Sequence, residues 1–332
     1  MRGNNSMDAQ QAVNTGLALL EQGKRNEALE QFEHAIGLEP KHGQAWFVKG
    51  CVMGDLGRTR DAAECYLQSL QYAPAYAALI LFNLGNCLRD LGEGERALEC
   101  FQSVTEMEPE NSDAWINQGV VLDNLGQPEE AIACYDTALR LAPDDFDAWA
   151  NRGNSLRALR EYDEAIECYE KALELNPNSR AALAGRGICV SELGDPENGL
   201  RLLDQCQSDP PFPPLLIERA TILSQLQRYD EAIEDIDRAV RLGANFPEAW
   251  ANRGECLVRL GQFPEAVASF ETALARNSRF VPAIYGKARA LCLCQQMDAA
   301  RETLEMYFTL ADEDDRRWEA AQQLREFCLD GE

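Results

Sequence analysis

The chain has 332 residues, 45% of them hydrophobic, which is enough apolar material for a packed core. Its 56 acidic residues outnumber 31 basic ones and give a formal charge of −25, which argues against nucleic acid as a partner because phosphate contacts need clustered Lys and Arg. The N-terminal MRGNNSMDAQQAV has no apolar signal-peptide core, and the most apolar run, at 77–82, is too short to cross a bilayer. We therefore expect a cytoplasmic protein without membrane insertion.

A helical pattern recurs along the chain with a period of about 34 residues. Residues 148–177 read AWANRGNSLRALREYDEAIECYEKALELNP, and a close copy, AWANRGECLVRLGQFPEAVASFETALARNS, starts at 249. Aligning the recurring Ala, aromatic and Pro positions divides the chain into a tail at 1–8, nine units and a capping helix at 315–332. The units span 9–42, 43–76, 78–111, 112–145, 146–179, 180–212, 213–246, 247–280 and 281–314.

Each unit predicts two amphipathic helices, because apolar residues recur at spacings of three and four. Leu-Gly pairs such as Leu125-Gly126 and Leu260-Gly261 fit the end of a first helix, with the glycine in the left-handed conformation. A small residue at the eighth position lets the two helices approach closely, and the aromatic columns pack there. One pair cannot cover its own apolar face, so neighbouring pairs must stack.

Two segments near the C-terminus depart from this pattern. In the unit 180–212, Gly199 and Leu203 replace the usual Ala and aromatic residue, and SDPPFPP at 208–214 crowds the junction with the next unit. After the last unit, DRRWEAAQQLREFCLD predicts a helix that caps the open end of the stack. Its apolar face is expected to hold Trp318, Ala321, Leu324 and Phe327.

The cysteines largely follow the repeat. Cys65, Cys100, Cys134 and Cys168 are spaced by 34 or 35 residues, and each precedes an aromatic residue. Spacing set by the repeat indicates small buried residues, kept reduced, and not a disulfide or metal framework.

Several repeat columns return together in unit after unit, among them Trp115, Gly119, Ala131, Tyr135 and Pro143. This pattern resembles the tetratricopeptide repeat, and the resemblance covers nearly the whole chain. It implies an all-α fold, a right-handed superhelix of nine helix-turn-helix repeats whose first helices line a concave groove.

The residues that catalysis needs are scarce. His34 and His42 are the only histidines, which leaves little material for a Ser-His-Asp, Cys-His or His-rich metal site. The segment GEGERAL at 92–98 lacks the Lys-Ser/Thr of a phosphate-binding loop. We predict a non-enzymatic protein without a metal ion or cofactor.

The resemblance implies that positions 2, 5, 6, 9, 12 and 13 of each first helix reach the groove. Positions six and nine of three consecutive units carry amides: Asn83, Asn86, Asn117, Asn151 and Asn154. An amide donates and accepts, and helices roughly 10 Å apart would let three amides hold about every third residue of an extended peptide. The alternative is that these amides are merely solvated; Asn252 shares the position but stands apart from the run.

An apolar stripe is expected beside these amides: Val13, Leu17, Phe47, Cys51, Phe82, Ile116 and Val120. On an open face, such a stripe would be a large exposed patch and hence a contact site, unless the superhelix or a second subunit covers it. Asp113 and Asp147 either orient the Asn side chains four residues on or meet basic ligand groups, and Arg89 and Arg157 flank them. A basic column at position seven, which includes Lys49, Arg152, Arg219, Arg253 and Lys287, is expected to pair with acids of neighbouring helices.

We predict a protein-binding scaffold whose groove, chiefly over 47–157, holds an extended segment of a neutral or basic partner protein. One alternative is an assembly subunit that uses its convex or end surfaces. The amide run also resembles the repeat superhelix of O-linked N-acetylglucosamine transferases, which suggests a targeting module for a transferase acting in trans. Chaperone-adaptor members of the family grip a C-terminal carboxylate with a Lys at position five; Phe47, Phe82 and Ile116 stand there, so no chaperone tail is expected.

Overall fold

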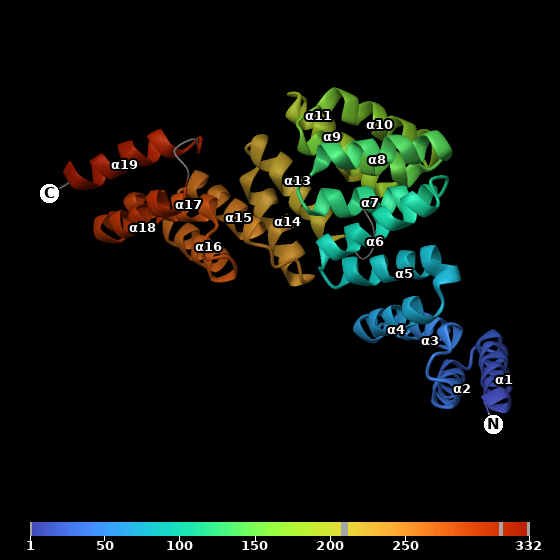
Figure 1. Cartoon of the computed structure of the whole chain (residues 1–332). Coiled ribbons are helices and arrows are strands. Elements are labelled where there is room, and N and C mark those ends of the chain that lie inside the picture. The colour runs from blue at the N-terminus through green and yellow to red at the C-terminus, as the bar shows by residue number, and fades with distance from the viewer. Residues whose placement is uncertain (1, 207–211, 312–314, 331–332) are drawn as a thin grey trace. The chain divides into compact units, whose positions relative to one another are not determined.

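The computed structural model describes residues 2–206, 212–311 and 315–330, and all regular secondary structure within them is helical (Figure 1). A 3-10 turn, Pro74–Tyr76, precedes α5. The helices are α1 (Arg2–Glu21), α2 (Arg25–Leu38), α3 (Gly43–Asp55), α4 (Thr59–Tyr72), α5 (Ala77–Asp90), α6 (Gly94–Met107), α7 (Ser112–Asn124), α8 (Pro128–Leu141), α9 (Phe146–Ala158), α10 (Tyr162–Leu175), α11 (Arg180–Glu192), α12 (Pro196–Gln205), α13 (Pro213–Gln225), α14 (Tyr229–Arg241), α15 (Pro247–Arg259), α16 (Phe263–Arg276), α17 (Val281–Leu293), α18 (Met297–Leu310) and α19 (Trp318–Asp330).

The predicted all-α architecture of helix pairs with a further C-terminal helix is confirmed. Helix α1 begins at Arg2, inside the segment that the sequence pattern assigns to a tail. Most of the crowded junction SDPPFPP lies outside the described residues.

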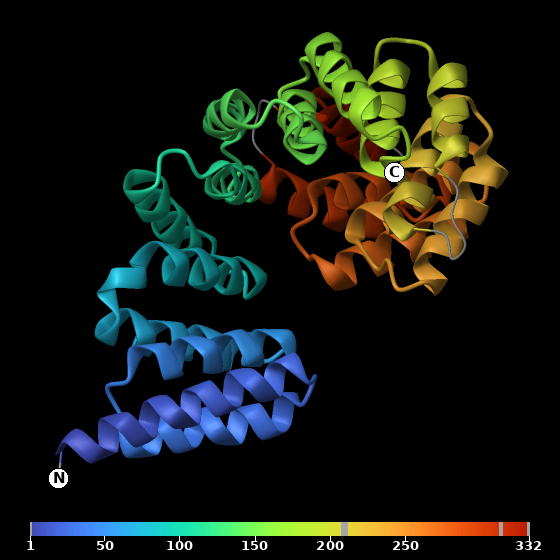
Figure 2. The same ribbon diagram turned by 90° about the vertical axis from the view of Figure 1, so that its right-hand side faces the viewer.

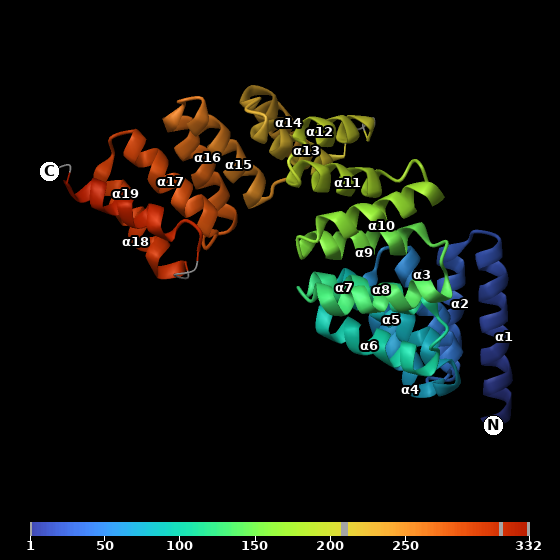
Figure 3. The same cartoon turned by 90° about the horizontal axis from the view of Figure 1, so that it is seen from above.

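The chain forms two compact units, residues 1–177 and 178–332, although no change in composition marks the boundary. In the N-terminal unit the pairs α1–α2 to α9–α10 stack in chain order (Figure 2). The C-terminal unit holds the pairs α11–α12 to α17–α18, followed by α19 (Figure 3). Within each unit the first helices of successive pairs are neighbours: α5 contacts α7, α7 contacts α9, and α15 contacts α17.

The turn inside each pair has a fixed backbone conformation. The predicted left-handed glycines are confirmed, with φ of 76° at both Gly126 and Gly261. Units without glycine at this position place Arg160, Gln227 and Gln295 in the same left-handed region, with φ of 64°, 58° and 60°. Because the turn geometry is imposed by the two helices it joins, it persists even where the residue type opposes it.

Glycines in the first helices allow an aromatic ring of the second helix to pack against the backbone. A Cβ atom on Gly119 would lie 2.6 Å from Cε1 of Tyr135, and one on Gly153 would lie 2.8 Å from Cε1 of Tyr169. Where Leu203 replaces the ring, Gly187 and Gly199 face each other, so the two helices still approach closely. Buried rings therefore form the centre of most pairs, and Leu203 and Ile236 take that place in α11–α12 and α13–α14.

Tryptophan at the fourth repeat position connects four of the pairs to the loop before them. The indole Nε1 donates to a proline carbonyl oxygen in three places: Trp46 to Pro40 (3.0 Å), Trp115 to Pro109 (2.9 Å) and Trp149 to Pro143 (2.9 Å). Trp250 donates in the same way to the Asn245 side chain, at 2.9 Å. These bonds fix α3, α7, α9 and α15 against the end of the preceding unit.

The basic column at position seven pairs with acids on the preceding second helix, as predicted. The shortest N–O distances are 3.0 Å for Lys49–Glu33, 2.7 Å for Arg152–Asp136, 2.8 Å for Arg219–Asp204, 2.8 Å for Arg253–Asp237 and 2.9 Å for Lys287–Glu271. Arg219 also contacts the buried carboxylate of Asp235 at 2.7 Å. Many of the basic side chains thus form ion pairs between helices of the stack.

The repeat-spaced cysteines lie in the core, as predicted. Ten of the twelve thiols are buried, and Cys51 and Cys294 are partly buried. Burial raises the pKa of the Cys65, Cys100 and Cys134 thiols to about 11, so these side chains are neutral packing residues.

Helix α19 packs on α18 through Trp318, whose ring centroid lies 5.0 Å from that of Phe308 and 6.2 Å from that of Tyr307. Ala321 is fully buried and Leu324 is partly buried, as predicted for the capping face. The assignment of Phe327 to that face is wrong, because 60% of this residue is exposed. Cys328, one position on, is buried instead, and its Sγ lies 2.8 Å from Sγ of Cys292.

Candidate binding surfaces

The thirteen side chains predicted to form the site all lie on first helices of the N-terminal unit. They are Phe47 on α3; Phe82, Asn83, Asn86 and Arg89 on α5; Asp113, Ile116, Asn117 and Val120 on α7; and Asp147, Asn151, Asn154 and Arg157 on α9.

The apolar stripe is less open than the sequence predicts. Val13 is fully buried, which corrects its assignment to an exposed face. Phe47 and Phe82 are half-buried because each leans on an aromatic ring of its own pair, at centroid distances of 5.9 Å to Tyr66 and 5.8 Å to Phe101. Ile116 and Val120 are likewise half-buried against the α7–α8 core. The stripe therefore exposes only the edges of its side chains and does not form a continuous apolar patch.

Two of the amides are oriented by their own helices. Asn83 Nδ2 donates to the Leu79 carbonyl oxygen, and Asn117 Nδ2 donates to the Asp113 carbonyl oxygen, each at 2.8 Å. Asp113 thus orients Asn117 through its backbone carbonyl oxygen and not through its carboxylate. Arg89 Nη1 donates to Asn117 Oδ1 at 2.6 Å, which joins two of the predicted residues across α5 and α7.

A pocket of about 590 Å³ brings four of the predicted residues together between α7 and α9: Val120, Asn151, Asn154 and Arg157. Asp123, Asn124 and Tyr135 also line it. Asn154 Oδ1 accepts a hydrogen bond of 2.8 Å from Tyr169 Oη. Within the described residues, the Asn151 side chain neither donates to nor accepts from a neighbour.

The pocket contains a carboxylate and a guanidinium. Asp123 accepts hydrogen bonds from Tyr135 Oη at 2.8 Å and from Ser155 Oγ at 2.7 Å. Burial nevertheless raises the pKa of Asp123, and this effect exceeds the opposing effect of those two hydrogen bonds. Arg157 Nε is buried and meets no hydrogen-bond acceptor in the described part of the chain. The Asn151 amide thus remains for a bound segment to satisfy, whereas Arg157 Nε is not accessible to one.

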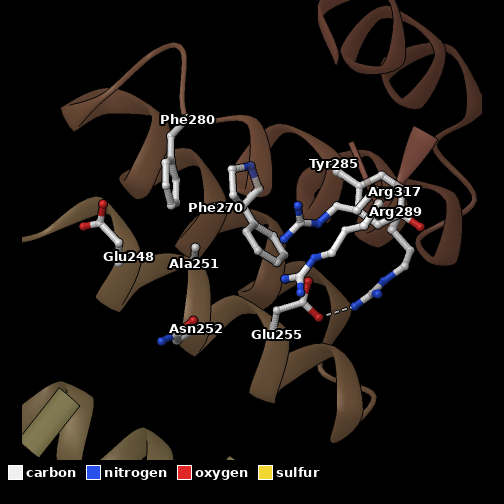
Figure 4. A pocket seen from close by; sticks show the side chains of 11 residues that line it. Glu248, Ala251, Asn252, Glu255, Phe270, Phe280, Tyr285, Arg289 and Arg317 are labelled. Carbon is white, nitrogen blue, oxygen red and sulfur yellow. Dashed lines mark hydrogen bonds and ion pairs between the residues drawn. The ribbon is translucent and has the colours of Figure 1, made fainter. Parts of the chain in front are cut away.

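The C-terminal unit has a second pocket, of about 640 Å³, that the sequence analysis missed (Figure 4). It is lined by Glu248, Ala251, Asn252, Glu255, Phe270, Phe280, Pro282, Tyr285, Arg289, Arg316 and Arg317. The only sequence signal was Asn252 at the sixth repeat position. The arginines were not seen because they come from α17 and from the segment before α19, two places that no repeat pattern links.

Across residues 2–206, 212–311 and 315–330, no three His, Cys, Asp or Glu side chains are grouped to hold a metal ion. Over the same ranges, none of the helices has the length and apolar character required to traverse a bilayer.

Helix pairs that share a regular turn and stack on one another in chain order define an α-solenoid repeat protein. Profiles described as tetratricopeptide repeat match residues 13–52, 50–99, 82–146 and 217–279, and further profiles of the same description match 146–179 and 257–324. The chain therefore belongs to the tetratricopeptide repeat family.

Two curated relatives match a third of the chain. The CTR9 homolog of Arabidopsis thaliana is 27% identical over 109 residues, 33% of this chain and 10% of that protein. The probable UDP-N-acetylglucosamine–peptide N-acetylglucosaminyltransferase SPINDLY of Hordeum vulgare is 28% identical over 115 residues, 33% of this chain and 12% of that protein. The matched part thus spans about a tenth of the length of these relatives.

Two solved structures share the fold. The APC/C hetero-tetramer Cut9-Hcn1 superposes with a TM-score of 0.66 and 15% identity, over 97% of this chain and 76% of that one. A tetratricopeptide repeat protein from Parabacteroides merdae superposes with a TM-score of 0.57 and 19% identity, over 91% and 99%. The repeat solenoid supports a general role as a protein-interaction scaffold.

Proposed function

We propose that the N-terminal unit is a non-enzymatic scaffold that binds an extended segment of a partner protein along α3, α5, α7 and α9. The observation that carries this proposal is the pocket between α7 and α9. It gathers Asn151, Asn154 and Arg157 beside Asp123, and the Asn151 amide lacks a partner in the described residues. Such an amide favours binding where a ligand supplies the missing hydrogen bonds.

The amides suit peptide backbone better than a particular side chain. Asn117 is held by the Asp113 carbonyl and by Arg89, so its second N–H is already oriented for a ligand carbonyl. Asn151 keeps both its carbonyl oxygen and its NH₂ group for a peptide unit. A pre-oriented amide loses little freedom on binding, which favours affinity without sequence selectivity.

The charge of the chain favours a neutral or basic partner. The formal charge of −25 would slow the approach of an acidic protein, and Asp123, Asp113 and Asp147 lie along the same helices. Binding of a basic segment is therefore expected to weaken as the salt concentration rises.

The test replaces Asn83, Asn117 and Asn151 together by Ala. Partner capture from lysate, quantified by mass spectrometry against the wild-type chain, is expected to fall about tenfold, since each lost hydrogen bond contributes about 0.5–1.5 kcal/mol. Asn26→Ala serves as the control, because Asn26 is an exposed amide on the second helix α2. Unchanged capture by the triple variant, at unchanged helical content, would contradict the groove proposal.

A second candidate is an assembly subunit that uses its convex surface. Leu67 on α4, Met107 on α6 and Leu175 on α10 are 42%, 48% and 44% exposed on second helices. A photo-crosslinker placed at Leu67 would capture the partner in that case, whereas one placed at Asn117 would capture it if the first helices bind.

A third candidate is a targeting module for a glycosyltransferase acting in trans, which the similarity to SPINDLY favours only through the repeats. Copurification of a transferase with the wild-type chain, lost in the triple variant, would support it.

A further inference from the structure

The pocket of the C-terminal unit concentrates positive charge in an acidic chain. Arg289, Arg316 and Arg317 line it together, although acidic residues outnumber basic ones 56 to 31 overall. Arg289 pairs with Glu255, and Arg317 Nη1 lies 3.5 Å from Asp315 Oδ2. Arg289 and Arg317 are thus each paired with a carboxylate, whereas Arg316 has no carboxylate partner among the described residues.

The donors of these arginines are only partly satisfied. A guanidinium carries five N–H groups, and Arg289 Nε is buried without a hydrogen-bond partner in the described residues. Arg316 is exposed and forms no ion pair with the described part of the chain. The exposed donors of Arg316 beside the cavity call for an acceptor, and a carboxylate matches their fork geometry.

The two ends of the pocket differ in chemistry (Figure 4). Arg289 and Arg317 lie with Tyr285 at one end, whereas Glu248 and Phe280 lie at the other. Ala251 and Asn252 lie toward the end that holds Glu248. A chain that crosses from one end to the other would meet an amide near the first end, an aromatic edge on each side and a cationic second end.

We propose that this pocket binds an internal Asp or Glu side chain of an extended partner segment, with an apolar neighbour packed on Phe280 and Tyr285. Arg316, the guanidinium without a carboxylate partner among the described residues, matches one carboxylate, whereas Glu248 and Glu255 in the same lining disfavour a phosphate dianion. The Asn252 amide holds the ligand backbone beside it. The acidic surface elsewhere excludes segments that carry many acidic residues, so the pocket selects one acid in a neutral context.

The experiment uses isothermal titration calorimetry with the full chain and dodecapeptides capped at both ends. Each peptide carries one central Glu beside Leu or Phe in a neutral Ser/Ala background, and a matched peptide carries Gln instead of Glu. The Glu peptides are expected to bind about tenfold more tightly, and this preference is expected to shrink as salt rises.

Variants assign the preference to the pocket. The single variant Arg316→Gln removes one exposed guanidinium with little risk to folding. The double variant, Arg289→Gln with Arg316→Gln, removes two guanidiniums. Both variants are expected to lose the preference for Glu. Arg241→Gln on α14 makes the same charge change at an exposed site outside the pocket and should keep it. Circular dichroism checks that each variant retains its helices.

The proposal is overturned if no capped peptide binds, if Glu and Gln peptides bind alike, or if the double variant keeps the preference. It is also overturned if only peptides with a free C-terminal carboxylate bind, since the occupant would then be a chain end. This site lies wholly in the C-terminal unit, so its failure leaves the proposal for α3–α9 untouched, and the reverse holds as well.

Discussion

Two glycines on first helices show that the same residue type has opposite consequences in different surroundings. A Cβ atom on Gly119 would collide with the Tyr135 ring, whereas one on Gly54 would meet nothing within 4 Å. Gly119→Ala is expected to destabilise the N-terminal unit by about 1–3 kcal/mol through overpacking. Gly54→Ala is expected to stabilise it by up to about 1 kcal/mol, because alanine favours the helix. Urea unfolding followed by circular dichroism measures both; equal effects would contradict the packing described for Tyr135.

Residue types that the fold demands were predictable, whereas side-chain orientations were not. Gly119 and Tyr135 recur with the repeat, because every pair must solve the same packing problem. The hydrogen bond of Asn117 to the Asp113 carbonyl and the leaning of Phe82 on Phe101 depend on rotamers. A sequence pattern places a residue on a helix face and leaves its rotamer undetermined, so the predicted exposure of the stripe was too large.

At the scale of the helix, α19 shows how the stack ends. Its contact with α18 depends on Trp318, which packs against Tyr307 and Phe308, and on the buried Ala321. Trp318→Ala is expected to cost about 2–3 kcal/mol and to increase amide hydrogen exchange in α18. Phe327→Ala, on the exposed side, should change stability by no more than about 0.5 kcal/mol. Exchange in α18 that is unaffected by Trp318→Ala would show that α19 does not protect it.

Helix boundaries were also largely predictable, since Leu-Gly pairs and the 34-residue period set them. The pocket of the C-terminal unit was not, because Arg289 and Arg317 belong to different repeat contexts and meet only through the packing of α19 after α18. Positive φ at Arg160 and Gln227 was missed for a related reason: the tertiary structure overrides the local preference of those residues.

At the scale of the whole molecule, two compact units predict two unfolding transitions in calorimetry of the full chain. Gly119→Ala is expected to lower the temperature of one transition, and Trp318→Ala that of the other, because each residue packs within its own unit. A single transition that both variants shift equally would contradict this division.

Tryptophan fluorescence reports on the joints of the solenoid, by which we mean the contacts between a first helix and the loop of the preceding unit. Four of the five indoles donate to the loop of the preceding unit, and Trp149 does so at the start of the helix that carries Asn151 and Arg157. Separation of a joint would release the indole to water and shift its emission to longer wavelength. Intrinsic fluorescence therefore reports on the closure of individual joints without any attached dye, and single Trp→Phe replacements would assign the signal to each one.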